Sequence, residues 1–147
     1  MVNIFEHYEL GEKLYQQVVS NVYKKYNLTY MEFTIIMFIA NNDYDTASDI
    51  VKYRSLTKSH VSISIKSLVE KGLIEETYLK NDRRTKHLKL TSNSNYIVRD
   101  GRKAQKGFIN ILNSGLSKSD VDMLKSFIDK INDNIKNNLI DKRYENE

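Results

Sequence analysis

The chain has 147 residues, the usual size of one domain with a hydrophobic core, and 40% of them are hydrophobic. It contains no cysteine, which excludes disulfides, thiol nucleophiles and cysteine-based zinc sites. No apolar run reaches the roughly 18 residues that a membrane-spanning helix needs, and no signal-peptide pattern opens the sequence. We therefore expect a cytoplasmic protein without a membrane partner.

The formal net charge of +4 is unevenly distributed along the chain. Residues 52–91 contain ten lysines and arginines against four acidic residues, a net charge of +6, which leaves −2 for the rest. A concentrated basic patch is typical of nucleic-acid binders, and a lysine-rich solvated surface is the common alternative. Charge alone favours DNA or RNA without deciding the matter.

Residues 3–25 are predicted to form a helix with a narrow apolar seam. Its members recur at alternating steps of four and three, a spacing typical of a helix that packs along another helix. Such a seam can pack on its own domain or on a second copy of the chain. The members are Ile4, Tyr8, Gly11, Tyr15, Val18 and Val22.

Residues 29–40 are predicted to form a second helix, which begins with a capping box. Thr29 stands at the N-cap, and Glu32 follows three residues later. The segment NNDYD at 41–45 has the composition of a turn. The side chains expected on the buried stripe are Phe33, Ile36, Met37 and Ala40.

Two further helices joined by a tight turn are predicted between residues 46 and 72. Thr46 or Ser48 begins the first, and Ser55-Leu56 ends it. Thr57 begins the second, and Gly72 lies where a glycine commonly follows a helix. This layout is typical of a helix-turn-helix. One face of its second helix is lined by Val61, Ile65 and Leu68.

A β-hairpin is predicted next, with strands LIEETYL (73–79) and KHLKLT (86–91) and the turn KNDRR (80–84) between them. A long helix begins at Thr91 or Ser92 and continues to about residue 113. A last helix begins at a capping box from Ser117 to Asp120. Its apolar positions are Val121, Leu124, Ile128, Ile131 and Ile135. The sequence thus predicts a mainly α fold with a small β-hairpin wing, in one domain over 1–147.

The order of these elements resembles the MarR family of winged-helix transcriptional regulators. The residues that carry the resemblance are Leu28-Thr29, the segment DIVKYRSLTKSHVSISIKSLVEKGLI (49–74) and the segment NDRRTKHLKLT (81–91). The family often has glycine where this chain has Ser55, and an arginine is common where it has Ile63. After the second strand, Thr91-Ser92-Asn93-Ser94 also departs from the family pattern.

The resemblance implies a winged helix-turn-helix lobe over 29–91, flanked by a helical dimerisation lobe made of 1–25 and 92–140. In this family the recognition helix enters the major groove and the wing reaches the adjacent minor groove. A ligand, where one exists, lies between the DNA lobe and the dimer helices. The residues expected to hold the homodimer are Ile4, Tyr8, Tyr15, Val18, Ile128, Ile131 and Ile135.

The side chains expected to contact double-stranded DNA lie on the recognition helix and the wing. Hydroxyl groups suit base edges or phosphates, and lysines and arginines suit phosphates. By resemblance to the family wing, Asp82 pairs with Arg84 and orients it for the minor groove. The predicted contacts are Thr57, Lys58, Ser59, His60, Ser62, Ile63, Lys66, Arg83, Arg84 and Lys86.

Ile63 has two interpretations, because it is aliphatic and lies on the face opposite the expected core. It could meet a thymine methyl group, the apolar group of the major groove. It could equally pack against the wing or a neighbouring helix.

The ten tyrosines suggest either core and dimer contacts or a pocket for an aromatic or phenolic ligand, for which Tyr15, Tyr30 and Phe33 are the first candidates. No catalytic motif is present, and the three histidines lack metal-ligand spacing. We therefore expect no enzyme, metal or cofactor. The leading hypothesis is a dimeric repressor that binds a pseudo-palindromic operator and can be released by a ligand. The alternative is a winged-helix module that binds a partner protein without specific DNA binding.

Overall fold

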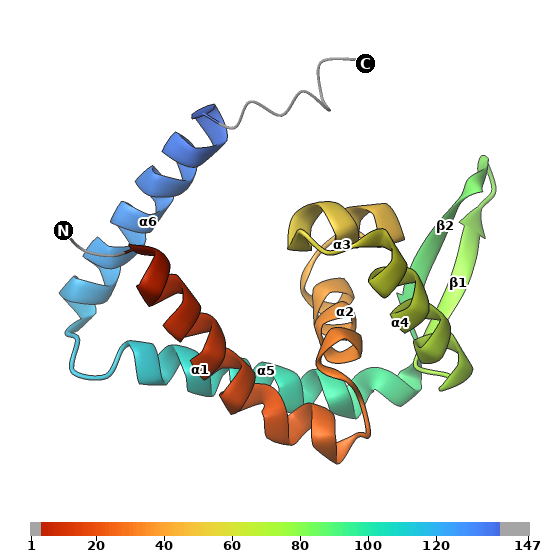
Figure 1. Cartoon of the computed structure of the whole chain (residues 1–147), viewed down its shortest axis with the longest axis horizontal. Helices are drawn as coiled ribbons and strands as arrows, with labels where there is room; N and C mark the ends of the chain where they lie inside the picture. The colour runs from red at the N-terminus through yellow and green to blue at the C-terminus, as the bar shows by residue number, and fades with distance from the viewer. Residues whose placement is uncertain (1–3, 139–147) are drawn as a thin grey trace. The chain divides into compact units, whose positions relative to one another are not determined.

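A computed structural model describes the backbone of residues 4–138 and the side chains from residue 7 onward in that range. The chain divides into two compact units, residues 1–109 and residues 110–147. The first unit holds a bundle of helices with the hairpin, and the second holds a helical segment (Figure 1).

The mainly α fold with one hairpin is confirmed (Figure 1). In chain order the helices before the hairpin are α1 (Ile4–Lys25), α2 (Tyr30–Asn41), α3 (Ala47–Arg54) and α4 (Lys58–Glu70). The hairpin is formed by β1 (Ile74–Leu79) and β2 (Asp82–Leu90). A single 3₁₀ turn (Ser92–Ser94), α5 (Asn95–Leu112) and α6 (Lys118–Asn138) follow.

The predicted helix starts are set by reciprocal capping hydrogen bonds. The Thr29 hydroxyl accepts from the Glu32 N–H at 3.1 Å, and the Glu32 carboxylate accepts from the Thr29 N–H at 2.7 Å. Thr46, rather than Ser48, forms the equivalent box with Asp49 at the start of α3. Thr57 stands at the N-cap of α4, but its side chain accepts no capping hydrogen bond, which leaves its hydroxyl exposed.

The tight turn between α3 and α4 depends on a left-handed residue. Ser55 adopts φ 50° and ψ 38°, and its N–H donates to the Val51 carbonyl. A non-glycine residue in this conformation costs about 1 kcal/mol, which accounts for the glycine that the family often has at the position of Ser55. Gly72, at φ 66°, ends α4 while the Leu73 N–H donates to the Leu68 carbonyl.

The hairpin turn is shorter than the sequence indicated. The predicted five-residue turn over 80–84 is wrong, because β2 already begins at Asp82, which pairs with Leu79. Asp82 Oδ1 accepts from the backbone N–H groups of Arg84 (2.8 Å) and Thr85 (3.2 Å). These bonds hold the start of β2 in place, so the charged residues that suggested a loop lie on a strand.

Helix α2 is the centre of the core of the first unit. Phe33, Ile36 and Met37 are buried as predicted, while Ala40 is only half-buried. Ile35 and Phe38 are also buried, because α2 is covered on several sides rather than along one stripe. Gly101 lets α5 approach α2 closely, since an added Cβ at this position would collide with Met37 and Phe33 of α2.

Helix α6 is different in that none of its described residues is buried. Val121 is half-buried, and the apolar side chains that follow it are exposed, namely Met123, Leu124, Phe127, Ile128, Ile131 and Ile135. The final capping box is present, with the Ser117 hydroxyl accepting from the Asp120 N–H at 3.2 Å. None of the helices in residues 4–138 is long and apolar enough to cross a membrane.

Candidate nucleic-acid interface and adjoining cleft

Helix α4 has one buried face and one exposed face. Val61, Ile65 and Leu68 are in the core, so the opposite side chains are directed to solvent. We call Ser59, Ser62, Ile63 and Lys66 the outward face of α4, and all four are exposed. The other predicted contacts on or next to this helix, Thr57, Lys58 and His60, are exposed too.

A buried carboxylate fixes the C-terminal end of α4. Glu32 is 3% exposed and accepts from the Ser67 hydroxyl at 2.6 Å and from Lys71 Nζ at 2.8 Å. Burial raises the pKa of Glu32, but the bonds from Lys71, Ser67 and the Thr29 N–H outweigh it and lower the pKa. The sequence identified Glu32 only as a cap. Ser67 and Lys71 lie one helical turn apart on α4, but no sequence signal connects this pair with Glu32 on α2.

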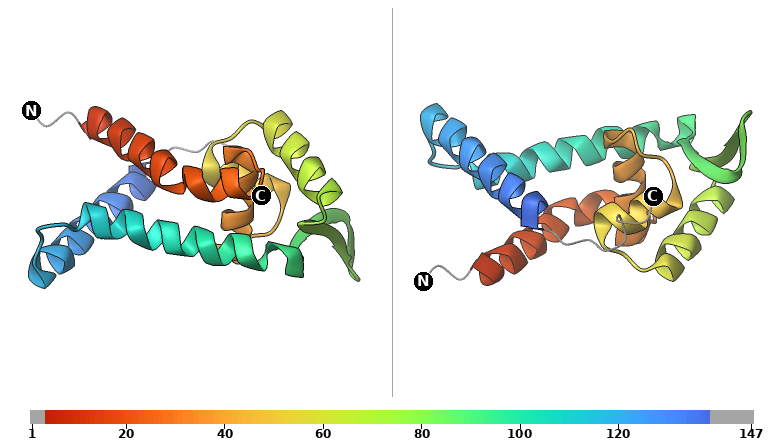
Figure 2. Two further views of the ribbon diagram at one scale, coloured as in Figure 1. Left: turned by 90° about the horizontal axis from the view of Figure 1, so that it is seen from below. Right: turned by 90° about the horizontal axis from the view of Figure 1, so that it is seen from above.

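The wing lies beside α4 (Figures 1 and 2). Ser62, Ile65 and Lys66 of α4 line a groove together with Glu76 and Lys86 of the hairpin. The arrangement places the outward face of α4 and the side chains of β2 at one end of the first unit. Residues widely separated in the sequence are therefore available to a single partner.

Asp82 orients the wing through its backbone. Hydrogen bonds from Thr85 and from the Arg84 N–H lower the pKa of Asp82, so this carboxylate stays ionised. The predicted partner was the Arg84 guanidinium, whereas the contact formed is to the Arg84 main chain. Arg83 and Arg84 are exposed, and within residues 4–138 neither forms an ion pair.

Two of the predicted phosphate-binding lysines have carboxylate neighbours. Lys86 Nζ lies 2.8 Å from Glu76 Oε2, and this contact raises the pKa of Lys86. Lys66 Nζ lies 4.0 Å from Glu70 Oε1. Because both pairs are largely exposed to solvent, each contributes little to stability, and either lysine can exchange its carboxylate for a phosphate.

His87 anchors the base of the wing, a role that the sequence did not indicate. Its Nδ1 lies 2.7 Å from Asp45 Oδ1, and the adjacent Leu88 N–H donates to the Asp45 carbonyl at 2.7 Å. The segment before α3 therefore pairs with β2 through an isolated antiparallel bridge between Thr46 and His87. This pairing holds the wing against the helices from the side opposite its tip.

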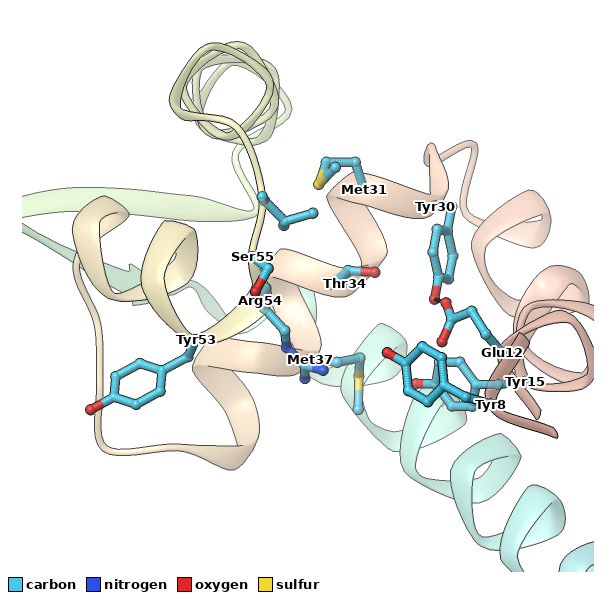
Figure 3. Close-up of a pocket in the computed structure, with 11 residues that line it drawn as sticks. Tyr8, Glu12, Tyr15, Tyr30, Met31, Thr34, Met37, Tyr53, Arg54 and Ser55 are labelled. Atoms are coloured by element: carbon cyan, nitrogen blue, oxygen red, sulfur yellow. Dashed lines mark hydrogen bonds between the residues drawn. The ribbon is translucent and has the colours of Figure 1, made fainter. Parts of the chain in front are cut away.

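A cleft of about 320 Å³ lies between α1, α2 and the end of α3 (Figure 3). Tyr15 and Tyr30, two of the three predicted ligand residues, line it. Phe33 does not, because it is 1% exposed and belongs to the core. Tyr8, which the sequence predicted as a dimer contact, also lines it, together with Glu12 and Arg54, which the sequence did not single out.

The cleft is lined by an acidic residue, Glu12, and a basic residue, Arg54. The Tyr30 hydroxyl donates to Glu12 Oε1 at 2.8 Å, and burial together with this bond raises the pKa of Tyr30. Gln105 Nε2 donates to the Tyr15 hydroxyl at 2.9 Å. A carboxylate, a guanidinium and tyrosine rings around one space suit a flat aromatic molecule that carries a polar or ionised group.

The predicted dimerisation residues differ in their surroundings. Tyr8, Ile128, Ile131 and Ile135 are exposed, whereas Tyr15 and Val18 are half-buried in the first unit. Tyr15 packs edge-on against Phe108, with ring centroids 5.3 Å apart. The side chain of Ile4 lies outside the described residues. Within the described part of the chain, no cluster of three or more histidines and acids could hold a metal ion.

Two packed helices with a tight turn, followed by a hairpin beside the second helix, define a winged helix-turn-helix protein. Residues 26–85 match the model of the MarR family. Within this segment the chain is similar to the MarR family, and its fold is that of solved winged-helix regulators of that family. No curated protein sequence matches it.

Solved structures share the fold at low sequence identity. A MarR family transcriptional regulator from Listeria monocytogenes, complexed with 26mer DNA, is 20% identical with a TM-score of 0.81, over 92% of this chain and 90% of that one. A MarR protein from Peptoclostridium difficile is 18% identical with a TM-score of 0.78, over 92% and 88%. The reduced form of MarR from E. coli is 17% identical with a TM-score of 0.70, over 89% and 97%.

Proposed function

We propose that the protein is a dimeric, sequence-specific DNA-binding regulator, a repressor that acts in the cytoplasm on a pseudo-palindromic operator. The observation that carries this proposal is the outward face of α4 lying beside a wing whose arginines are exposed and form no ion pair with the residues that the structure describes. The Listeria monocytogenes relative, which was complexed with DNA, supports the same reading. The role needs no catalytic group, metal or cofactor.

In this proposal α4 enters the major groove. Ser59 and Ser62 offer hydroxyl groups at the base edges, while Lys58 and Lys66 neutralise phosphates. The dense positive charge of residues 52–91 releases counterions from the DNA, so affinity should fall steeply with salt. The Glu32 hydrogen bonds to Ser67 and Lys71 keep the far end of α4 fixed on the core.

The wing carries the minor-groove contact. Arg84 is exposed, and Asp82 fixes its backbone from within the hairpin, so the main chain needs no ordering when the guanidinium enters a narrow A·T-rich groove. Arg83 and Lys86 lie on either side of it in the sequence and meet phosphates. Lys86 must exchange Glu76 for a phosphate to do so.

The exposed apolar side chains of α6 supply the dimer contact. Ile128, Ile131 and Ile135 repeat at steps of three and four on a helix without buried residues, so a second copy of the chain is the partner that would cover them. A twofold dimer places two recognition helices on half-sites about 34 Å apart, or one helical turn.

The cleft lined by Tyr15 and Tyr30 is the proposed site for a phenolic or aromatic ligand that releases the operator. Arg54, at the end of α3, lies on one side of it and α1 on the other (Figure 3). A ligand that separated these helices would shift α3, and the tight turn at Ser55 would transmit the shift to α4. Release requires that the ligand bind the DNA-free arrangement more tightly.

The test is selection of bound DNA from random sequence, followed by fluorescence-anisotropy titration of Arg84→Ala. We expect the variant to lose operator affinity by at least about tenfold, with a shallower salt slope, while remaining dimeric. Lys103→Ala, which removes an exposed lysine on α5, is the control and should bind like the original protein. Equal affinity of Arg84→Ala and the control would remove the wing from the mechanism.

The alternative proposal, a module that docks on a partner protein, predicts a different outcome. Such a protein would give no gel shift that survives excess competitor DNA, and selection would enrich no sequence. The positive charge on α4 and the wing favours DNA.

A further inference from the structure

The outward face of α4 contains one apolar residue. Ile63 is 68% exposed, whereas Val61 and Ile65 on either side of it are buried in the core. Its neighbours on the exposed surface are Ser59, one turn before it, and Lys66, about one turn after it. An aliphatic side chain therefore lies in the middle of a polar and basic surface. The interpretation that Ile63 packs against the wing is not what the described residues show.

Neither helix formation nor core packing accounts for an isoleucine at this position. Isoleucine is β-branched and is a poorer helix former than alanine, lysine or glutamate, which are common on exposed helix faces. The core beneath α4 is already filled by Val61, Ile65 and Leu68. A contact with an apolar group of a bound partner would give the residue a role that the fold itself does not supply.

The rest of α4 limits how base pairs can be read. Between Lys58 and Glu70 the helix contains no arginine, asparagine or glutamine, the residues that make most bidentate contacts to guanine and adenine. Ser59, Ser62 and Lys66 offer mainly single hydrogen bonds. The one apolar group on the edges of base pairs in the major groove is the 5-methyl of thymine. A contact to this methyl group therefore contributes more to the discrimination between base pairs.

We infer that Ile63 is a specificity-determining residue, which reads the methyl group of one thymine in each half-site of the operator. The inference rests on the proposed function and deepens it, because it assigns a base to a residue. Cytosine presents an amino group and no methyl, so the same position would discriminate against a C·G pair. Ser62, directly adjacent, remains available for a hydrogen bond to the neighbouring base edge.

The experiment replaces each thymine of the selected operator by deoxyuridine, one position at a time and symmetrically in both half-sites. Deoxyuridine removes the methyl group and leaves every hydrogen-bonding group unchanged. We expect one thymine per half-site whose methyl is worth about fourfold in affinity, the effect of burying one such group. Ile63→Ala should bind the thymine and deoxyuridine forms equally at that position, while Ile63→Val should retain the preference.

Val69→Ala is the matched control on the same helix. Val69 is also a partly exposed apolar residue, but it lies near the C-terminal end of α4 and lines the groove toward the wing. Its variant should keep the deoxyuridine effect. Circular dichroism and thermal unfolding of Ile63→Ala should match those of the original protein, because the side chain is outside the core.

The outcomes separate this inference from the proposed function. If the original protein selects no DNA sequence, the proposed function fails and the inference fails with it. If it binds a selected operator but no thymine is sensitive to deoxyuridine, the inference is wrong and the proposed function stands. The same conclusion follows if the sensitive thymine remains sensitive with Ile63→Ala.

Discussion

Helix α4 of the winged helix-turn-helix and helix α6 both have apolar residues at steps of three and four, but this stripe is buried in α4 and exposed in α6. In α4, apolar residues at steps of four and three are buried by the rest of the first unit, as Val61 and Leu68 show. In α6, the similar run through Ile128 and Ile131 remains exposed. A periodic apolar stripe predicts that a helix will be covered, and only the fold tells whether the covering surface belongs to the same chain.

Electrostatic contacts follow the same division. In the first unit a buried carboxylate, Glu32, joins the start of α2 to the end of α4. At the start of α6 the carboxylate of Asp120 makes only its local bonds to Ser117. The first unit is therefore held by contacts between distant segments, whereas α6 relies on its own turns and on whatever partner covers its apolar side.

The largest expected effect is on dimerisation and comes from placing a charge on the exposed apolar stripe of α6. If the protein dimerises through α6 as proposed, Ile131→Asp should make it monomeric and raise the dimer dissociation constant by at least about a hundredfold, since an unpaired buried charge costs about 3 kcal/mol or more. Sedimentation velocity over a range of concentrations measures it. Ser126→Asp, on the opposite side of α6, is the control and should stay dimeric. A dimeric Ile131→Asp would show that α6 is not the interface.

The next effect concerns the stability of the first unit. Glu32→Gln should lower the free energy of unfolding by about 2 kcal/mol at pH 7, because it weakens charged hydrogen bonds to Lys71 and Ser67. The pKa of Glu32 is lowered in the folded state from its ordinary value of 4.5. Its contribution is therefore fully present above about pH 4.5 and is lost as the pH falls through the lowered value.

Urea unfolding at several pH values measures the difference in the free energy of unfolding between Glu32→Gln and the original protein. This difference should shrink below about pH 4.5, because only the original protein has a charge to lose at position 32. Asp120→Asn is the comparison in the second unit. Its pKa is also lowered, by the bonds to Ser117, but the group is exposed, so its substitution should change stability less. If the two substitutions had equal effects, the contacts between α2 and α4 would be no stronger than a local cap.

The smallest expected effect concerns the wing. Glu76→Gln frees Lys86 and should raise affinity for non-specific DNA by about threefold, with a steeper salt dependence. Glu75→Gln makes the same change of net charge one residue earlier on β1, beside Lys89 rather than Lys86. Anisotropy titrations of the two variants separate the local effect from net charge. If both gained affinity equally, Lys86 would not be a phosphate contact.

Local signals predicted much of this molecule correctly. The capping boxes at Thr29 and Ser117, the tight turn at Ser55 and the glycine after α4 each depend on residues within four positions of one another. Such interactions form in any context, so the sequence reveals them. The concentration of basic residues between 52 and 91 is likewise a property of the chain itself.

The tertiary structure decided what depends on distant segments. Glu32 lies 35 residues from Ser67, and Asp45 lies 42 residues from His87, so neither contact could be predicted from spacing. The sequence predicted Phe33 both on the buried stripe of α2 and as a ligand residue, and the packed fold places it in the core, where α5 approaches closely at Gly101. Periodicity shows which face of a helix is apolar. Which element packs against that face is decided only in the folded protein, because close packing brings together residues that are far apart in the sequence.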